Sequence, residues 1–354
     1  MNSLKKTFPV FYEIKQLRRE RKELYQKAFR KFEQEKPFHG SLSDYKKALN
    51  HHRVSYEEYM YGYEWWKLNE KERDQYITQR EMWCIYRKTI HANVLKHFAD
   101  KVLFLKTFND FIHRGWIMPK EVSFEEFEEF VSARKCIAKP IFGEMGKGIF
   151  LIEQGCGTLE LYNECKNNNY LVEERIKGCD ELTEFHPESL NTIRVVTMSG
   201  KGKCEVLGAL LRMGIDSSFV DNTSSGGIVV PIDVQTGVTR TDGFDLKGKQ
   251  YKVHPNSGKK LNGFQIPNWN NCLELCRKAS AVVPETYFAG WDICVLPNGD
   301  VEIIEGNSAP DFNGGIQTLN KGLKYKIREL SKDMLDFDPI SLISIWSRSY
   351  KKYD

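Results

Sequence analysis

Apolar and polar positions follow a helical period in the first quarter of the chain. The apolar positions recur on one side of a 3.6-residue period, at Leu17, Leu24, Ala28 and Phe32, with arginines and lysines between them. Tyrosines and tryptophans gather between residues 56 and 66, and we assign them to a second or third helix. Residues 1–95 carry no strand signal, so the pattern predicts a charged helical region at the N-terminus.

Beyond residue 95 the pattern becomes mixed. Short runs of strand-forming residues bounded by glycine, proline or asparagine predict strands, and longer periodic runs predict helices. The expected helices cover residues 125–133, 158–167, 267–283 and 318–335. The expected strands cover residues 136–152 around a turn, 170–173, several segments between 191 and 234, and a hairpin at 290–306.

The hairpin near the C-terminus carries acidic residues at one end. Its turn, at residues 297–300, has the sequence Pro-Asn-Gly-Asp. A hairpin brings the start of its first strand beside the end of its second, so Asp292 should meet Glu305 and Asn307. Glu305 and Asn307 are two residues apart and therefore leave the same face of the strand. Such oxygen ligands suit Mg²⁺, and the alternative is an ordinary acidic hairpin end.

A glycine-rich turn joins the two strands expected in residues 136–152. The turn brings together residues that suit phosphate, namely Gly143, Gly146, Lys147 and Gly148, and Lys139 ends the strand before it. Glycines let the backbone approach a ligand and expose N–H donors, and a lysine adds a point charge. The spacing matches neither the P-loop nor the dinucleotide fingerprint. The alternative is a plain hairpin with a flexible loop.

Two arginines are candidates for anion contacts. Arg194 lies in an otherwise apolar strand, where a buried charge requires a partner, and Arg212 lies further along the chain. A guanidinium group presents a planar fork of donors to carboxylate or phosphoryl oxygens. We expect Asn191 to orient Arg194, and a structural salt bridge is the alternative use of Arg194.

Composition limits the class of protein. Of 354 residues, 41% are hydrophobic and 28% charged, which is ordinary for a globular protein. The net charge of +4 is too small for a nucleic-acid-binding footprint, and no apolar run reaches the roughly 18 residues of a membrane-spanning helix. The start lacks a signal-peptide pattern and the nine cysteines lack metal-like clustering, so we expect a cytoplasmic protein. Cys272 and Cys276 are expected to be core thiols.

The order and spacing of these motifs resemble the ATP-grasp superfamily. The resemblance is carried by Lys139-Pro140 with the glycines, by residues 171–176, and by Asp292, Glu305 and Asn307. Residues 186–197, Leu211-Arg212 and residues 221–228 resemble the sugar-transfer-associated branch, which is found with polysaccharide biosynthesis.

The resemblance covers roughly residues 95–325 and implies an α+β architecture. Two α+β subdomains would grip ATP behind a helical N-terminal region at residues 1–95. The nucleotide-binding subdomain would cover residues 96–182, the subdomain with the metal site residues 183–330, and a tail residues 331–354.

The resemblance also implies roles for individual residues. Lys101 would join Lys139 at the phosphates. Backbone groups of Glu174 and Ile176 would contact adenine, with Glu173 near its amino group. Either Asp180 or Glu181 would accept hydrogen bonds from the ribose. The implied cofactors are ATP and Mg²⁺, with two ions expected and Mn²⁺ as an alternative.

The implied activity is that of an ATP-dependent carboxylate–amine ligase that acts through an acyl phosphate. One substrate would belong to surface-polysaccharide or capsule assembly, as an amino acid joined to a sugar or polysaccharide precursor. The alternatives are a kinase that phosphorylates a sugar or polyol, and a nucleotide-regulated binding protein without turnover. The basic N-terminal helix either has a solvated face or contacts a membrane surface peripherally. The substrates and the oligomeric state stay open.

Overall fold

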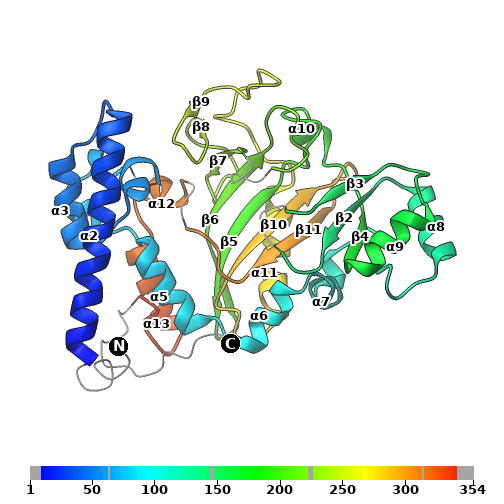
Figure 1. Ribbon diagram of the computed structural model, residues 1–354, viewed down its shortest axis with the longest axis horizontal. Coiled ribbons are helices and arrows are strands. Elements are labelled where there is room, and N and C mark those ends of the chain that lie inside the picture. The colour runs from blue at the N-terminus through cyan, green and yellow to red at the C-terminus, as the bar shows by residue number, and fades with distance from the viewer. Residues whose placement is uncertain (1–8, 63, 144–146, 222–225, 313–314, 341–354) are drawn as a thin grey trace. The chain divides into compact units, whose positions relative to one another are not determined.

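A computed structural model describes residues 9–62, 64–143, 147–221, 226–312 and 315–340. The chain divides into two compact units. One unit is formed by Met1–Thr89 and Gln317–Asp354, and the other by Ile90–Ile316. We describe each unit by itself (Figure 1).

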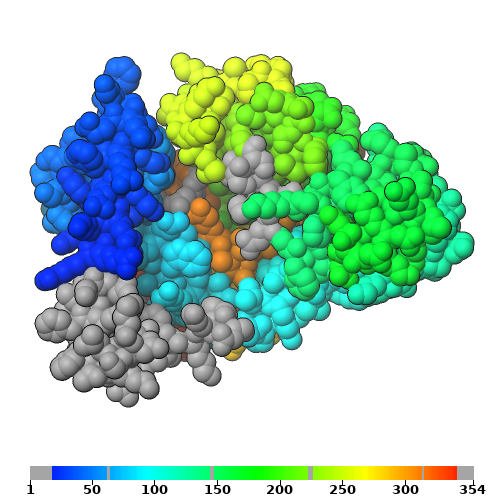
Figure 2. Space-filling model, viewed as in Figure 1, coloured from blue at the N-terminus to red at the C-terminus, as the bar shows by residue number. Residues whose placement is uncertain are grey.

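The first unit is helical in its described part, which confirms the prediction that no strand lies there. Its helices and helical turns are α2 (Pro9–Glu35), α3 (Leu42–His52), η1 (Glu58–Gly62), η2 (Trp65–Lys67), α4 (Glu70–Arg73), α5 (Gln79–Thr89) and α13 (Lys324–Met334). Basic residues of α2 that are exposed include Arg18, Arg19, Arg21, Lys22 and Lys27, on the helix that forms the blue surface in Figure 2.

Aromatic side chains form the core of this unit. Tyr45, Tyr56 and Trp65 are almost fully buried, and Ala28 of α2 packs against them. The residues between 56 and 66 do not share one regular helix as predicted, because a π-helical turn ends at Gly62 and a separate 3₁₀ turn carries Trp65. Tyr63 lies outside the described residues.

The segment after residue 316 belongs to this helical unit. Gln317 accepts a hydrogen bond from the Ile77 N–H at 2.7 Å and donates to the Ile77 carbonyl at 2.9 Å. Lys324 forms an ion pair of 2.9 Å with Glu81. This grouping differs from the expected division, in which residues up to 330 belong to the metal-site subdomain. The contacts that attach this segment to the helical unit join residues more than two hundred positions apart in the sequence.

The second unit contains a four-stranded antiparallel sheet with the order β1-β4-β2-β3. Its strands are β1 (Trp116–Ile117), β2 (Cys136–Pro140), β3 (Phe150–Ile152) and β4 (Tyr170–Glu174). The helices α8 (Phe124–Ala133) and α9 (Leu159–Asn167) lie together beside this sheet (Figure 1). Both begin at a capping residue, because the hydroxyl groups of Ser123 and Thr158 accept backbone N–H bonds of the first turn. Both helices were predicted from the sequence.

A seven-stranded antiparallel sheet forms the rest of the second unit, with the order β11-β10-β5-β6-β7-β8-β9. Its strands are β5 (Ile193–Gly200), β6 (Lys203–Met213), β7 (Ile228–Ile232), β8 (Gly243–Phe244), β9 (Gln250–Tyr251), β10 (Phe288–Val295) and β11 (Val301–Asn307). Further helices of this unit are α6 (Ala92–Ala99), α7 (Lys101–Thr107), η3 (Asn109–Phe111), α10 (Asp180–Thr183) and α11 (Trp269–Ser280). Helix α12 (Ile316–Leu319) begins at the last residue of this unit, and its other residues belong to the first unit.

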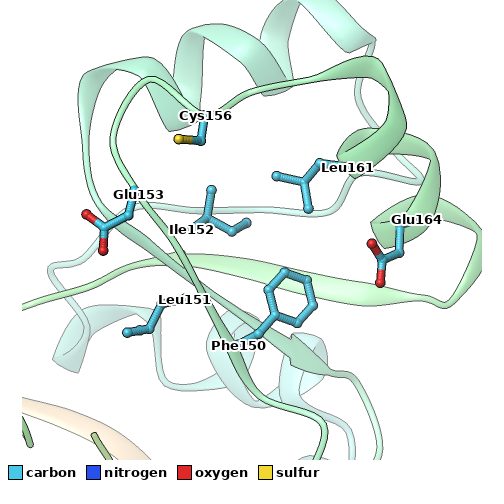
Figure 3. A pocket seen from close by; sticks show the side chains of 7 residues that line it. All are labelled: Phe150, Leu151, Ile152, Glu153, Cys156, Leu161 and Glu164. Carbon is cyan, nitrogen blue, oxygen red and sulfur yellow. The ribbon is translucent and has the colours of Figure 1, made fainter.

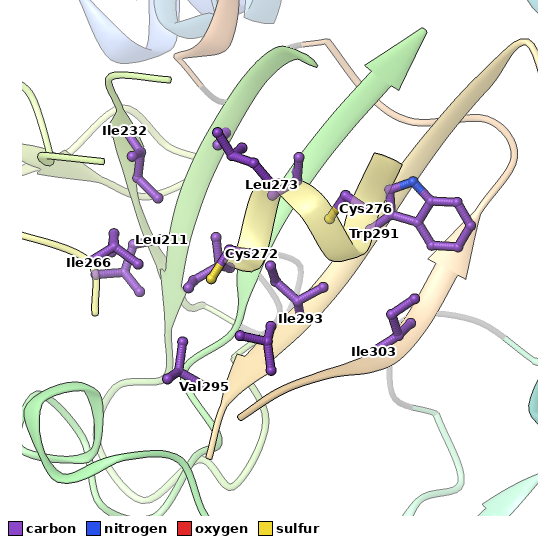
Figure 4. Close-up of a cluster of buried hydrophobic side chains, with 14 of the residues drawn as sticks. Leu211, Ile232, Ile266, Cys272, Leu273, Cys276, Trp291, Ile293, Val295 and Ile303 are labelled. Carbon is purple, nitrogen blue, oxygen red and sulfur yellow. The ribbon is translucent and has the colours of Figure 1, made fainter. Parts of the chain in front are cut away.

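One face of the large sheet packs against α11. Figure 4 shows Cys272 and Cys276 of this helix facing Trp291 and Ile293 of β10, and all four side chains are buried. The two cysteines are therefore core thiols, as predicted. Burial of each large apolar side chain stabilises the fold by roughly 1.5–3 kcal/mol. Since alternate residues of a strand face opposite ways, the neighbours of Trp291 and Ile293 lie on the other face.

In the described part of the chain, we find no helix with both the length and the apolar character that crossing a membrane requires.

Candidate active site

The acidic hairpin has the predicted arrangement. Strands β10 and β11 pair so that Asp292 lies opposite Glu305, and Gly290 lies opposite Asn307. The next pair joins Ile293 to Ile303, so Ile304 is the extra residue of a β-bulge. Register therefore brings the three predicted metal ligands to one end of the ribbon.

The polar face of the large sheet brings both candidate arginines to Asp292. Arg194 on β5 donates through Nε and Nη2 to the two carboxylate oxygens, with an Nη2–Oδ2 distance of 2.7 Å. Arg212 on β6 donates to Oδ2 at 2.7 Å and lies 3.6 Å from a carboxylate oxygen of Asp221. Arg194 is half-buried, and its charge is paired with Asp292 in the salt bridge that the sequence analysis gave as the alternative use of this arginine.

These cations decide the charge of Asp292. Burial alone would raise the pKa of Asp292, but the guanidinium groups of Arg194 and Arg212 outweigh burial and hold it well below its usual range. The pKa of Glu305 is raised. The larger cause is the loss of hydration by the surrounding protein atoms, and the second is the negative charge of Asp292. The Glu305 side chain nevertheless remains exposed to solvent.

The donor set fits a hard cation such as Mg²⁺. Asp292, Glu305 and Asn307 offer oxygen ligands. Oδ2 of Asp292 accepts from both guanidinium groups, but Oδ1 accepts only from Arg194 and keeps a lone pair for a cation. The Asn307 oxygen accepts one hydrogen bond, from the Ala309 N–H at 2.8 Å, and also keeps a lone pair. The two carboxylates and the two arginines nearly cancel in charge, so a divalent cation suits this site best together with anionic phosphate. No cluster of three His, Cys, Asp or Glu side chains suited to a metal occurs among the described residues.

The glycine-rich turn joins antiparallel strands β2 and β3, as predicted. Gly143 and Gly148 have φ angles of +144° and +73°, which side chains rarely adopt. Lys147 is exposed, and Gly146 lies outside the described residues. Lys101, in the first turn of α7, donates to the Gly143 carbonyl at 2.8 Å, so this lysine lies at the same turn.

Lys139 and Glu173 form an ion pair between neighbouring strands β2 and β4. The Glu173 carboxylate also accepts two hydrogen bonds from Arg114 at 2.9 and 3.0 Å. Two cations within the protein therefore balance the charge of Glu173, and its place beside the adenine amino group stays a prediction. Lys139 remains partly exposed, and its contact with phosphate stays a prediction.

The predicted adenine-binding segment follows Glu173. The Glu174 N–H donates to the Gly115 carbonyl at 2.8 Å, so this donor is already used. Ile176 is half-buried beyond the end of β4. Asp180 and Glu181 both lie exposed in the first turn of α10, and Asp180 is 3.4 Å from Lys177. The choice between the two carboxylates for ribose stays open.

Asn191 has a different role from the one expected. Its amide donates to the carbonyls of Leu182 and His186 at 3.0 and 2.8 Å, and its oxygen accepts from Ser189 at 2.7 Å. Its φ angle of +52° is one that asparagine tolerates better than most residues. These contacts fix the loop before β5, so the prediction that Asn191 orients Arg194 is wrong.

Arg114 was missed by the sequence analysis. It lies in the loop between η3 and β1 and is buried, with Glu173 on one side and Glu302 of β11 on the other. A single arginine in a short loop carries no periodic or motif signal. Its apolar neighbours Ile112 and Trp116, which are partly buried in the structure, are the signal that could have pointed to an enclosed loop.

Acid should weaken the fold through Glu173. Burial alone would raise the pKa of Glu173, but Arg114 and Lys139 lower it to about 2. Because the folded-state pKa lies below the ordinary value, this stabilisation is complete above about pH 4.5 and is lost as the pH falls towards 2. The free energy of unfolding, measured with urea at about pH 6 and at about pH 3, should fall less in Glu173→Gln than in the wild type. Equal drops would contradict the assignment.

A pocket of about 420 Å³ lies beside strand β3 (Figure 3). Its lining side chains are Phe150, Leu151, Ile152, Glu153, Cys156, Leu161 and Glu164. None of the candidate nucleotide or metal residues lines it. The candidate site therefore rests on the charged residues of the two sheets and not on this pocket.

The site can be compared with known proteins. A profile of the sugar-transfer associated ATP-grasp family matches residues 86–331. The solved ATP-grasp ligase PsnB, complexed with minimal precursor, Mg and ADP, aligns with a TM-score of 0.38 and 13% identity, over 67% of this chain and 54% of that chain. N5-carboxyaminoimidazole synthetase from Staphylococcus aureus, complexed with ADP, aligns with a TM-score of 0.42 and 10% identity, over 70% of this chain and 51% of that chain.

The chain thus spans about half the length of these two solved structures. The comparison with curated proteins gave no match.

Proposed function

Because this chain belongs to the sugar-transfer associated ATP-grasp family and has its α+β fold, we propose that it is an ATP-dependent carboxylate–amine ligase. One observation carries the proposal. Asp292 and Glu305 lie opposite each other on a hairpin, and Arg194 and Arg212 converge on Asp292 from the neighbouring strands. Groups suited to a metal and groups suited to a substrate carboxylate are therefore adjacent.

Each part of the site has a defined task in this proposal. Asp292, Glu305 and Asn307 would hold Mg²⁺, which when bound neutralises charge on the ATP phosphates. Lys101, Lys139 and the N–H groups of the glycine-rich turn hold the phosphates. Catalysis is then mostly positioning and charge stabilisation.

The reaction proceeds in two steps. An oxygen of the substrate carboxylate attacks the γ-phosphorus, the bond to the ADP oxygen breaks, and ADP leaves. The amine attacks the carbonyl carbon of the acyl phosphate, loses a proton, and displaces phosphate to give an amide. Arg194 or Arg212 holds the carboxylate and then stabilises the negative charge on the carbonyl oxygen.

The family's association with sugar transfer supports a substrate from surface-polysaccharide or capsule assembly. We propose that an amino acid is joined to a sugar carboxylate or an amino sugar in the cytoplasm. Peripheral contact with a membrane through the exposed basic face of α2 is compatible with a lipid-linked acceptor.

A pairwise substrate screen tests this function. ADP release is measured across amino acids and sugar acids or amino sugars, alone and in pairs, with ATP and Mg²⁺. The expected result is release that depends on two substrates together. Release with a single hydroxyl substrate, and a stable phosphorylated product, would indicate a kinase. Nucleotide binding without release across the whole screen would indicate a binding protein.

A further inference from the structure

The Arg114 guanidinium uses all five of its N–H donors within the protein. Two go to Glu173, through Nε at 3.0 Å and Nη2 at 2.9 Å. One Nη1 donor goes to Glu302, and the remaining donors go to the carbonyls of Ile303 at 2.8 Å and Ile304 at 3.0 Å. Because arginine has five N–H donors, the group is saturated and its orientation is determined from several directions.

The two carbonyl contacts depend on the β-bulge in β11. Successive carbonyls of a regular strand point to opposite sides, so one guanidinium does not ordinarily reach two in a row. Ile304 is the extra residue of the bulge, and this irregularity lets Arg114 bind the carbonyls of both Ile303 and Ile304. Glu305 is the next residue, so Arg114 determines the backbone position from which this carboxylate leaves the strand.

The other side of Arg114 leads to the nucleotide lysine. Glu173 accepts from Arg114 and pairs with Lys139, so Arg114 also determines where the Lys139 ammonium lies. The second oxygen of Glu302 is buried and has no hydrogen-bond partner among the described residues. Arg114 and Lys139 together balance the charges of Glu173 and Glu302, which makes removal of Arg114 costly to both carboxylates.

We propose that Arg114 is a positioning residue that sets the separation between the phosphate-binding Lys139 and the metal-binding Glu305. It ties β4 of the small sheet to β11 of the large sheet, and it does so through the bulge directly before Glu305. This inference rests on the proposed function, since both the lysine and the carboxylate act on ATP and its metal.

The test uses Arg114→Lys in the full chain, with Arg73→Lys as a matched control. Arg73 is equally buried and binds Asp44, Glu70 and the Trp65 carbonyl, but it belongs to the helical unit. Lysine keeps the charge at either position but loses the planar fork. Thermal unfolding is measured for each variant, together with the affinity for Mn²⁺ as a probe, by electron paramagnetic resonance with a non-hydrolysable ATP analogue.

Both variants are expected to unfold at lower temperature. Only Arg114→Lys should weaken Mn²⁺ binding, by on the order of tenfold, the scale of losing an outer-shell partner of a metal site. Wild-type Mn²⁺ affinity in Arg114→Lys, or equal weakening in Arg73→Lys, would overturn the proposal and leave Arg114 with a purely structural role.

Two further results keep the test decisive. If Arg114→Lys does not fold, Glu302→Gln takes its place, because it keeps the shape of the side chain and the Arg114–Glu173 pair. Weaker Mn²⁺ binding in Glu302→Gln supports the proposal, and unchanged binding contradicts it. A wild-type protein that binds neither the analogue nor Mn²⁺ would refute the proposed function itself, and with it the premise of this inference.

Discussion

Glu305→Gln is expected to reduce ATP turnover by on the order of a thousandfold at saturating Mg²⁺. The substitution removes one of two anionic ligands at the site where phosphate charge is neutralised. A bound metal contributes several kcal/mol to such a reaction, and each ~1.4 kcal/mol changes the rate tenfold. Glu305 is the best position for this test because it is exposed, whereas loss of Asp292 would remove the carboxylate that Arg194 and Arg212 share.

The control for Glu305→Gln lies at the other end of the same hairpin. Asp300→Asn removes one carboxylate from the exposed turn and should leave turnover unchanged. ADP release is measured for both variants with the substrate pair from the screen, and thermal unfolding checks that both remain folded. Normal turnover in Glu305→Gln would exclude this carboxylate as a metal ligand.

Arg212→Ala is expected to lower hydroxamate formation by on the order of a hundredfold or more, the scale of losing one transition-state donor. Hydroxylamine replaces the natural amine, attacks the acyl phosphate and displaces phosphate, so a hydroxamate reports the proposed intermediate. Affinity for a non-hydrolysable ATP analogue should change less. Arg212 is preferred to Arg194 because Asp292 then retains its bidentate partner on β5.

The control for Arg212→Ala is Arg240→Ala. Arg240 is an exposed arginine of the same unit that pairs with Asp233 at 3.3 Å. Colorimetric hydroxamate detection is run beside phosphate release for the wild type and both variants. Equal activity of the Arg212 and Arg240 variants would remove Arg212 from the reaction. A stable phosphoester without hydroxamate in the wild type would move the protein to the kinase class.

Much of the fold and part of the site followed from local pattern. Alternating strand residues around a Pro-Asn-Gly-Asp turn predicted the β10–β11 hairpin, and a hairpin has few registers compatible with its turn. The meeting of Asp292 with Glu305 therefore followed from the sequence. The glycine-rich turn and the capped helices α8 and α9 also depend on neighbouring residues, and their local signals were sufficient.

Residue roles that depend on partners outside their own helix, strand or turn were decided by the tertiary structure. Asn191 is near Arg194 in sequence, but the carbonyls that its amide binds belong to Leu182 and His186. The sequence resemblance placed Glu173 near adenine but did not show that Arg114, fifty-nine residues earlier, binds its carboxylate. Such contacts leave no periodic signal in the sequence, because each of the two residues fits the local pattern of its own strand or loop whether or not the contact forms.

By itself, the sequence determined the β10–β11 hairpin, the glycine-rich turn between β2 and β3, the helices α8 and α9, and the end of the hairpin where carboxylates gather. These features depend on backbone preferences and on the two-residue period of a strand, both of which act over short distances. Only the tertiary structure decided that Arg194 and Arg212 share Asp292, that residues after 316 join the helical unit, and that Arg114 reaches the bulge before Glu305. The reason is that a charged side chain requires a partner only once it is buried. Which charges become buried, and which partners lie near them, is decided by how the chain packs.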